Sequence, residues 1–167
     1  NYACATTTPG SGVLENTLYT YDGNGNLTVA KDPLGRSTTN TYDNNDRLTR
    51  EQWGINFGAV YDYAYDNADQ LTGTSGAGGN VSYTYDPLGN MTAQGDTTFT
   101  YDLASRMTST TNAGVVTGYR YDGDSKRVDR STNGTVDTRY VWDQANDLSE
   151  LVAEQNAAGT VQRRYVH

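Results

Sequence analysis

The residues whose types could do chemistry are pairs of aspartates in short polar stretches. Asp43 with Asp46, and Asp122 with Asp124, lie close enough in sequence to suggest a general acid and a general base. These pairs recur with the period of a sequence repeat, and they lie among Asn and Gly residues, which favour exposed turns. We therefore interpret the carboxylates as structural groups that shape turns.

Conventional nucleophilic or metal catalysis needs residues that this sequence does not bring together. Cys4 is the only cysteine and His167 the only histidine, which leaves no Ser-His-Asp triad, Cys-His pair or metal cluster. The stretch DGNGN at 22–26 spaces its oxygens like the start of a calcium loop, but no bidentate acidic residue follows, so a hairpin turn is favoured. We predict a non-enzymatic protein without cofactor or metal. Cys4 is expected to be a free thiol, with an interchain disulfide as the alternative.

The aspartates belong to a phrase that the chain repeats seven times. Each phrase pairs an aromatic residue with Asp, continues with turn-forming residues, and in six copies reaches Leu or Met six residues after the aromatic, with Thr following in five. The phrases start about 20 residues apart, which indicates stacked supersecondary units. The sixth phrase reads as one residue longer, with Val128 in the place of Leu. The predicted structural residues are Tyr21, Asp22 and Leu27; Tyr42, Asp43 and Leu48; Tyr65, Asp66 and Leu71; Tyr85, Asp86 and Met91; Tyr101, Asp102 and Met107; Tyr121, Asp122 and Val128; and Trp142, Asp143 and Leu148.

Each phrase predicts a β-hairpin. Aromatic residues alternate with other residues before the Asp, as in YTYD at 83–86, and this period places both rings on one face of a strand. The Asp carboxylate is expected to accept backbone N–H bonds two or three residues later, and Leu or Met then begins the return strand. We predict an all-β fold, one continuous twisted antiparallel sheet of hairpins of about 20 residues, with a strand also at 148–155. Second turns are predicted between phrases at 32–35, 76–80, 112–114, 133–134 and 156–159.

The composition predicts an aromatic core. Leu, Ile, Val and Phe make up only about 15% of the residues, a level that in a strongly charged chain usually indicates disorder. Fourteen Tyr and two Trp replace them at regular intervals, and rings bury large areas. We expect ring beside ring across neighbouring strands, so that the sheet itself serves as the core.

The charge pattern excludes some partners. The net charge is -8, and the ten Arg and two Lys are dispersed among sixteen Asp, so we expect cross-strand ion pairs and no nucleic-acid partner. No apolar run reaches the length of a membrane span, and we expect no membrane insertion.

The phrases resemble the YD repeats of the Rhs family, which includes bacterial Rhs proteins, the B and C components of insecticidal toxin complexes, and teneurins. The resemblance covers 17–167 and rests on the seven aromatic-Asp phrases and on segments such as DPLGRSTTNTYD and RRYVH. It implies a spiralling β-sheet that in full-length relatives forms a hollow shell around a toxic C-terminal segment. The shell-closing segment with its self-cleaving aspartates is missing here, so self-cleavage does not carry over. Residues 1–16 are expected to lie outside the repeats, either as an extended segment that could pair as a strand with another copy or as a disordered leader.

Two functions of different classes follow from these patterns. The first is a structural protein outside a bacterial cell, either a wall segment of a shell, including a shell that encloses a toxin, or a subunit of a filament that assembles through open sheet edges. The second is a glycan-binding surface module, because exposed rings flanked by Asn and Asp are typical of sugar-binding surfaces. The candidate stacking rings are Trp53, Tyr61, Tyr63 and Trp142.

Overall fold

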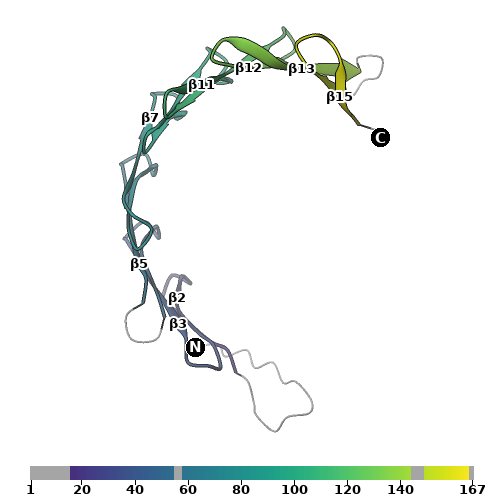
Figure 1. The fold of residues 1–167 in the computed structure, drawn as a ribbon. Helices are drawn as coiled ribbons and strands as arrows, with labels where there is room; N and C mark the ends of the chain where they lie inside the picture. The colour runs from purple at the N-terminus through teal and green to yellow at the C-terminus, as the bar shows by residue number, and fades with distance from the viewer. Residues whose placement is uncertain (1–15, 55–57, 144–148, 166–167) are drawn as a thin grey trace, which may run out of the picture. The chain divides into compact units, whose positions relative to one another are not determined.

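The computed structural model describes residues 16–54, 58–143 and 149–165, and this part of the chain is built from strands and turns without a helix. Fifteen antiparallel strands follow one another in chain order, which confirms the all-β prediction (Figure 1). Cys4, Leu148, His167 and nearly all of the predicted segment 1–16 lie outside the described residues. The strands are β1 (Leu18–Tyr21), β2 (Leu27–Lys31), β3 (Ser37–Tyr42), β4 (Leu48–Trp53), β5 (Val60–Tyr65), β6 (Leu71–Gly76), β7 (Val81–Tyr85), β8 (Met91–Gln94), β9 (Thr97–Tyr101), β10 (Met107–Asn112), β11 (Val115–Tyr121), β12 (Arg127–Thr132), β13 (Thr135–Asp143), β14 (Glu150–Gln155) and β15 (Val161–Arg164).

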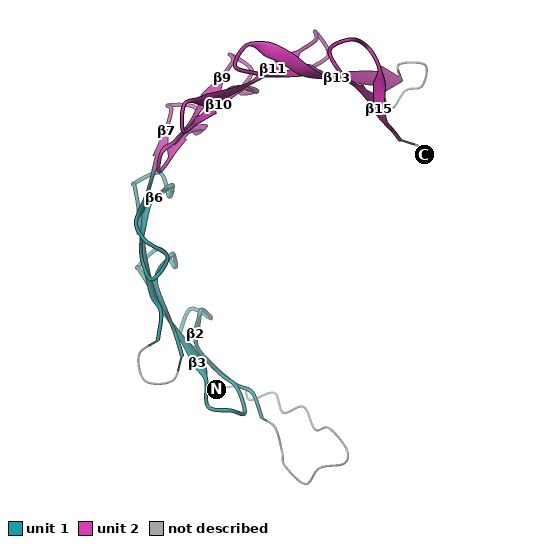
Figure 2. Cartoon of the chain, viewed as in Figure 1, with its two compact units in different colours: residues 1–82 teal, residues 83–167 magenta. Residues whose placement is uncertain are grey.

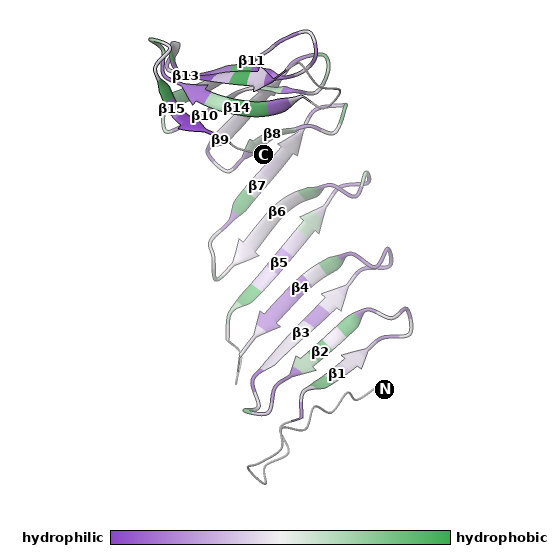
Figure 3. Ribbon diagram, turned by 90° about the vertical axis from the view of Figure 1, so that its right-hand side faces the viewer, coloured by the Kyte–Doolittle hydropathy of each residue, from purple (hydrophilic) through white to green (hydrophobic). Residues whose placement is uncertain are grey.

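The chain divides into two compact units, residues 1–82 and residues 83–167 (Figure 2). In the first unit, β1 to β6 lie side by side, and turns connect them at alternating edges of the sheet (Figure 3). The second unit continues the same pattern of consecutive antiparallel pairs from β8 to β15. The boundary falls within β7, so each unit is a run of hairpins of one kind.

A β-bulge recurs where each phrase turns into its return strand. Tyr21 pairs with Leu27 and Thr20 with Val29, so Thr28 is the extra residue. The hydroxyl of Thr28 donates to the Thr20 carbonyl oxygen at 3.0 Å, back across the hairpin. The Thr that follows Leu or Met therefore stands at the bulge. The same shift of register recurs after Tyr42, Tyr65, Tyr85 and Tyr101.

The sixth phrase corrects one assignment made from the sequence. Tyr121 pairs with Arg127, six residues later, so this phrase has the same length as the others. Val128 occupies the bulge position, where other phrases have Thr, and Arg127 takes the place of Leu. Val128 had been placed at the paired position because the other phrases have an apolar residue there. In the seventh phrase, Trp142 pairs with Leu151.

The sheet has no thick interior. Within each unit the described strands pack only against their neighbours in sequence, so both faces of the sheet meet solvent. Ala153 and Asp129 are the buried residues among those described, and few strand residues are strongly hydrophobic (Figure 3). Trp53 and Tyr61 form a ring pair, with centroids 5.9 Å apart. The expected buried aromatic core is therefore wrong, because a sheet one layer thick leaves the described rings half-buried or exposed.

Candidate functional site

In the first six phrases, the Asp closes the turn by accepting two backbone hydrogen bonds. Asp102 Oδ1 accepts from the backbone N–H groups of Ala104 at 2.9 Å and Arg106 at 3.0 Å. The sequence predicted N–H donors two or three residues after the Asp. The donor at two residues is confirmed, whereas the second donor lies four residues after the Asp, because the turn is one residue longer than an Asx turn alone. The first six phrases share this geometry, and Asn156 reproduces it with its amide oxygen.

In the first six phrases, the residue three positions after the Asp has a left-handed backbone. Gly25 and Gly89 fit this conformation without strain, with φ of 92° and 85°. Asp46, Asp69 and the equivalent serines adopt it as non-glycine residues, with φ near 60°. A short polar side chain at this place is consistent with the tolerance of Asp for left-handed backbone.

These turns are linked to one another along one edge of the sheet. Asn26 Nδ2 donates to Asp46 Oδ1 of the next phrase at 2.7 Å. Arg47 then reaches the third phrase, where its Nη1 lies 2.7 Å from Asp69 Oδ1 and 2.9 Å from the Asp66 carbonyl oxygen. In the second unit, Asn90 donates to Ser105 and Arg106 to Ser125. We call this series of contacts the turn ladder.

The phrase rings make a second link between hairpins. The hydroxyls of Tyr42, Tyr65 and Tyr121 donate at 2.9 Å to the carbonyl oxygens of the residues that begin the return strand of the preceding phrase, Leu27, Leu48 and Met107. Trp142 does the same with its indole N–H, which donates to the Arg127 carbonyl oxygen at 2.9 Å. These four rings are half-buried. We call them the ring clamps.

Arginine side chains cover two of the clamp rings. Arg47 lies 4.9 Å from the centroid of the Tyr65 ring, and Arg106 lies 5.0 Å from that of Tyr121. Both arginines also take part in the turn ladder, so one side chain joins the turn of its own phrase to the ring of the next. Cation–π contact of this kind contributes about 0.5–1 kcal/mol at exposed sites.

The turn geometry also sets the ionisation of the phrase carboxyls. The backbone N–H of Arg106 is the largest cause that lowers the pKa of Asp102 below its ordinary value. The side chain of Arg47 is the largest cause that lowers the pKa of Asp43. Each carboxylate is stabilised in its charged form by donors that the folded turn supplies. The pKa values of Asp22, Asp32 and Asp86 are lowered as well.

The dispersed arginines pair across strands, as predicted. Arg50 lies 3.3 Å from Asp62, and Arg130 lies 2.8 Å from Asp137. Arg120 forms an ion pair with Asp129, the one buried charged residue among those described. These pairs hold neighbouring strands together without extending from one phrase turn to the next.

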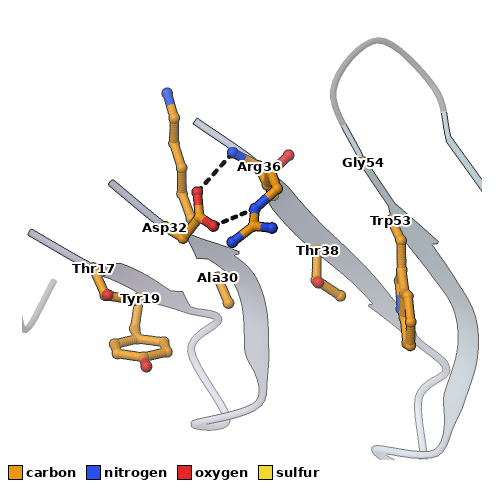
Figure 4. Close-up of a pocket in the computed structure, with 10 residues that line it drawn as sticks. Thr17, Tyr19, Ala30, Asp32, Arg36, Thr38, Trp53 and Gly54 are labelled. Atoms are coloured by element: carbon orange, nitrogen blue, oxygen red, sulfur yellow. Dashed lines mark hydrogen bonds and ion pairs between the residues drawn. The ribbon is translucent and has the colours of Figure 1, made fainter. Parts of the chain in front are cut away.

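A hollow of about 390 Å³ lies on one face of the first unit. Tyr19, Ala30, Thr38 and Trp53 form a single row across β1 to β4, since each pairs with the next. Figure 4 shows the four side chains pointing the same way from the sheet, with a ring at each end. We call this row the Tyr19–Trp53 shelf. The Asp32–Arg36 ion pair also lines the hollow.

The candidate stacking rings from the sequence have different surroundings. Trp53 is 50% exposed and frames the shelf, and Tyr61 meets it edge to face. Tyr63 is half-buried, with its hydroxyl 3.4 Å from Glu51 Oε2, and Trp142 is a ring clamp. Tyr19 is the shelf ring that the sequence did not single out, because only the register across four strands places it in the row of Trp53.

The aspartates of the candidate acid–base pairs make structural hydrogen bonds in the turns. Asp43 and Asp122 accept hydrogen bonds inside their own turns, while Asp46 belongs to the turn ladder. The described residues contain no group of three or more His, Cys, Asp or Glu that could hold a metal ion. In Asp22, both carboxylate oxygens accept hydrogen bonds from Asn26. Within the described ranges, no helix has the length and hydropathy of a membrane span.

Comparison with known proteins gives one match to a family model. The model, described as the teneurin YD-shell, matches residues 7–163. No curated protein sequence matches the chain. Similar solved structures include "TcdB2-TccC3-Cdc42", at 16% identity and a TM-score of 0.49, covering 84% of this chain and 10% of that one.

Two further structures are similar. One is TcdB2-TccC3 without its hypervariable C-terminal region, at 14% identity and a TM-score of 0.46, covering 84% of this chain and 10% of that one. The other is a mutant Tc holotoxin pore of Photorhabdus luminescens, at 14% identity and a TM-score of 0.47, covering 89% and 12%. The chain thus spans about a tenth of the length of each of these solved chains.

Proposed function

The chain belongs to the teneurin YD-shell family, and from this premise we propose that it forms a segment of the wall of a β-sheet shell. Family membership confirms the resemblance to YD repeats drawn from the phrases. The wall is a structural, non-enzymatic element in this proposal, and it stands outside the cell as part of a secreted or surface protein.

The repeated links between hairpins are the observation that supports this role. Each ring clamp joins a hairpin to the one before it, and the turn ladder joins the same hairpins along one edge. A structure of this kind is stabilised by neighbour contacts and extends by adding units. A sheet one layer thick with self-consistent links is suited to enclosing a space, because it needs no second layer to hold its shape.

Two finer versions of the proposal differ in what the wall does. In one, the wall belongs to a shell that encloses a toxic polypeptide. In the other, copies of the chain stack through their sheet edges and form a filament. Filament assembly stays a prediction from the sequence, and the contacts between hairpins within one chain favour neither version.

Electron microscopy of the polypeptide purified from its natural source tests the wall. We expect a hollow particle whose wall is one β-sheet thick, and an intact mass well above that of 167 residues. A solid particle, or a chain of 167 residues that remains monomeric, would contradict a shell wall. Light scattering measures assembly at increasing protein concentration. Fibres whose length increases with concentration would favour the filament over the shell.

A further inference from the structure

We propose that a hollow in the second unit, lined by Arg127 and by residues of β11, β13 and β14, binds a small aromatic carboxylate (Figure 2). The Arg127 guanidinium would hold the carboxylate, and the rings of the hollow would hold the aryl group. This inference goes beyond the wall and does not depend on it, because the site lies within one unit and needs no closed shell.

Arg127 departs from the pattern of the repeat. The other six phrases have Leu or Met six residues after the aromatic, whereas the sixth phrase has Arg127 at this place. Arg127 pairs with Tyr121 where the return strand begins, beside the ring of its own phrase. A position at which a repeat breaks its own local rule is a candidate for function.

The guanidinium of Arg127 lies among rings, with its Cζ atom 4.5 Å from the centroid of Tyr119 and 5.9 Å from that of Tyr121. Its Nε atom is buried and has no hydrogen-bond partner in the part of the chain that the structure describes. Burial acts to lower the pKa of Arg127, but the neighbouring hydroxyls of Tyr121 and Tyr140 outweigh this and raise it. The group is therefore charged, and its neighbours are neutral.

The charge of Arg127 is not balanced by a carboxylate. Within the described residues, ion pairs join seven other arginines to Asp or Glu, but none of these pairs includes Arg127. A cation withdrawn from water is costly unless an opposite charge lies beside it. An anionic ligand would supply that charge and would also give the buried Nε–H an acceptor.

The hollow beside Arg127 suits an aryl group. Its volume of about 370 Å³ lies within the range of small-molecule pockets. Its apolar lining comes from the side chains of Tyr121, Tyr140, Trp142 and Leu151. Tyr121 and Trp142 are ring clamps, so their polar atoms bond to the preceding hairpin and their rings are held in place. An inorganic anion would leave this lining uncovered, whereas an aryl group would stack on it.

The charges beside the hollow match an anion with a single charge. Lys126 also lines the hollow, and its side chain is only 16% exposed. The Lys126 ammonium lies 4.0 Å from a carboxylate oxygen of Asp124, so Asp124 offsets its charge. The charge of Arg127 is left for the ligand, and the planar guanidinium fits the two oxygens of a carboxylate.

Heteronuclear NMR of the ¹⁵N-labelled chain tests the site, because Trp142 lines this hollow and Trp53 lines the shelf of the first unit. The probes are 3-phenylpropanoate, its neutral amide, acetate, inorganic phosphate and glucuronate. We expect 3-phenylpropanoate to shift the Trp142 indole N–H signal saturably while the Trp53 signal stays in place. The other probes should bind at least about tenfold more weakly, because each lacks the charge or the ring.

Three outcomes would overturn the inference. In the first, 3-phenylpropanoate shifts neither indole signal or shifts both equally. In the second, the neutral amide binds as tightly as 3-phenylpropanoate, which would make the charge of Arg127 irrelevant. In the third, phosphate or glucuronate binds more tightly than 3-phenylpropanoate, which would show that the site does not select an aryl group.

Variants then locate the site. Arg127→Leu introduces the residue type that other phrases have at this place, so it should fold and should weaken binding by about tenfold or more. Lys126→Gln removes the second cation and should weaken binding by about threefold. Arg164→Leu removes an exposed arginine of β15 and should bind as the parent does. Unchanged binding in Arg127→Leu or in Lys126→Gln, with the fold verified by circular dichroism, would overturn the assignment.

Discussion

The ring clamps and the Tyr19–Trp53 shelf use the same residue types in different surroundings. A clamp ring is half-buried, and its polar atom donates to a backbone carbonyl of the preceding phrase. The shelf rings make no such bond within the described residues, and they stand apart across small side chains. The difference teaches that the position of an aromatic residue in the repeat, rather than its identity, decides whether its polar atom bonds to the preceding hairpin.

Removing a clamp ring should have the largest effect. Tyr121→Ala loses the hydrogen bond to Met107 and the contact with Arg106, so we expect the free energy of unfolding to fall by about 3 kcal/mol. Urea unfolding followed by circular dichroism measures this change. A loss no larger than that of a shelf variant would erase the distinction between the two classes of ring.

Breaking a phrase turn should have the next largest effect. Asp102→Ala removes the acceptor of two backbone N–H groups, and we expect a melting temperature lower by about 3–5 °C. Asp102→Asn is the matched control, since Asn156 closes the same turn with an amide. Equal melting of Asp102→Ala and the parent would show that the carboxylate does not hold the turn.

Acid should weaken the turns of both units. The folded pKa values of Asp22, Asp43, Asp86 and Asp102 lie below the ordinary value, so their contribution to stability is present above about pH 4. This stability contribution is lost as the pH falls through the pKa values of the folded state, because protonated carboxyls accept hydrogen bonds from the same N–H donors less well. Thermal melting between pH 2 and pH 7 measures the effect. A melting temperature that rises toward acid would contradict it.

A shelf ring should have the smallest effect on stability. Trp53→Ala removes an exposed ring and one edge contact with Tyr61, so we expect a loss of about 1 kcal/mol or less. The same urea titration measures it beside Tyr121→Ala. A loss equal to that of Tyr121→Ala would make Trp53 a structural residue and remove the contrast.

Much of the fold could be predicted because the repeat carries its own turn chemistry. The Asp at a fixed place and the alternating rings identify hairpins without any knowledge of tertiary contacts. The Gly95–Asp96 turn between β8 and β9 was missed, although the two-residue turn at 133–134 was predicted. Val128 was misplaced because a bulge position and a paired position can only be distinguished once the register of the strands is known.

The links between hairpins were harder to predict. Which carbonyl lies within reach of a tyrosine hydroxyl depends on twist and on the offset between neighbouring hairpins. Tyr101 illustrates this, since it belongs to the same phrase pattern as Tyr121, yet the structure describes no hydrogen bond from its hydroxyl. The preceding phrase starts 16 residues earlier, a shorter stride than elsewhere. Trp53 could be singled out as a ring without a core role, but Tyr19 required the pairing of four strands.

Hydrogen exchange of Tyr121→Phe and Tyr101→Phe, each compared with the parent chain, tests the ring clamps most directly. Both variants remove one hydroxyl and keep the ring, but only Tyr121 donates to a carbonyl oxygen of the preceding phrase. We expect faster amide exchange in β10 to β12 for Tyr121→Phe and unchanged exchange around β9 for Tyr101→Phe. Equal exchange in the two variants, whether fast or slow, would contradict the claim that these hydrogen bonds join one hairpin to the next.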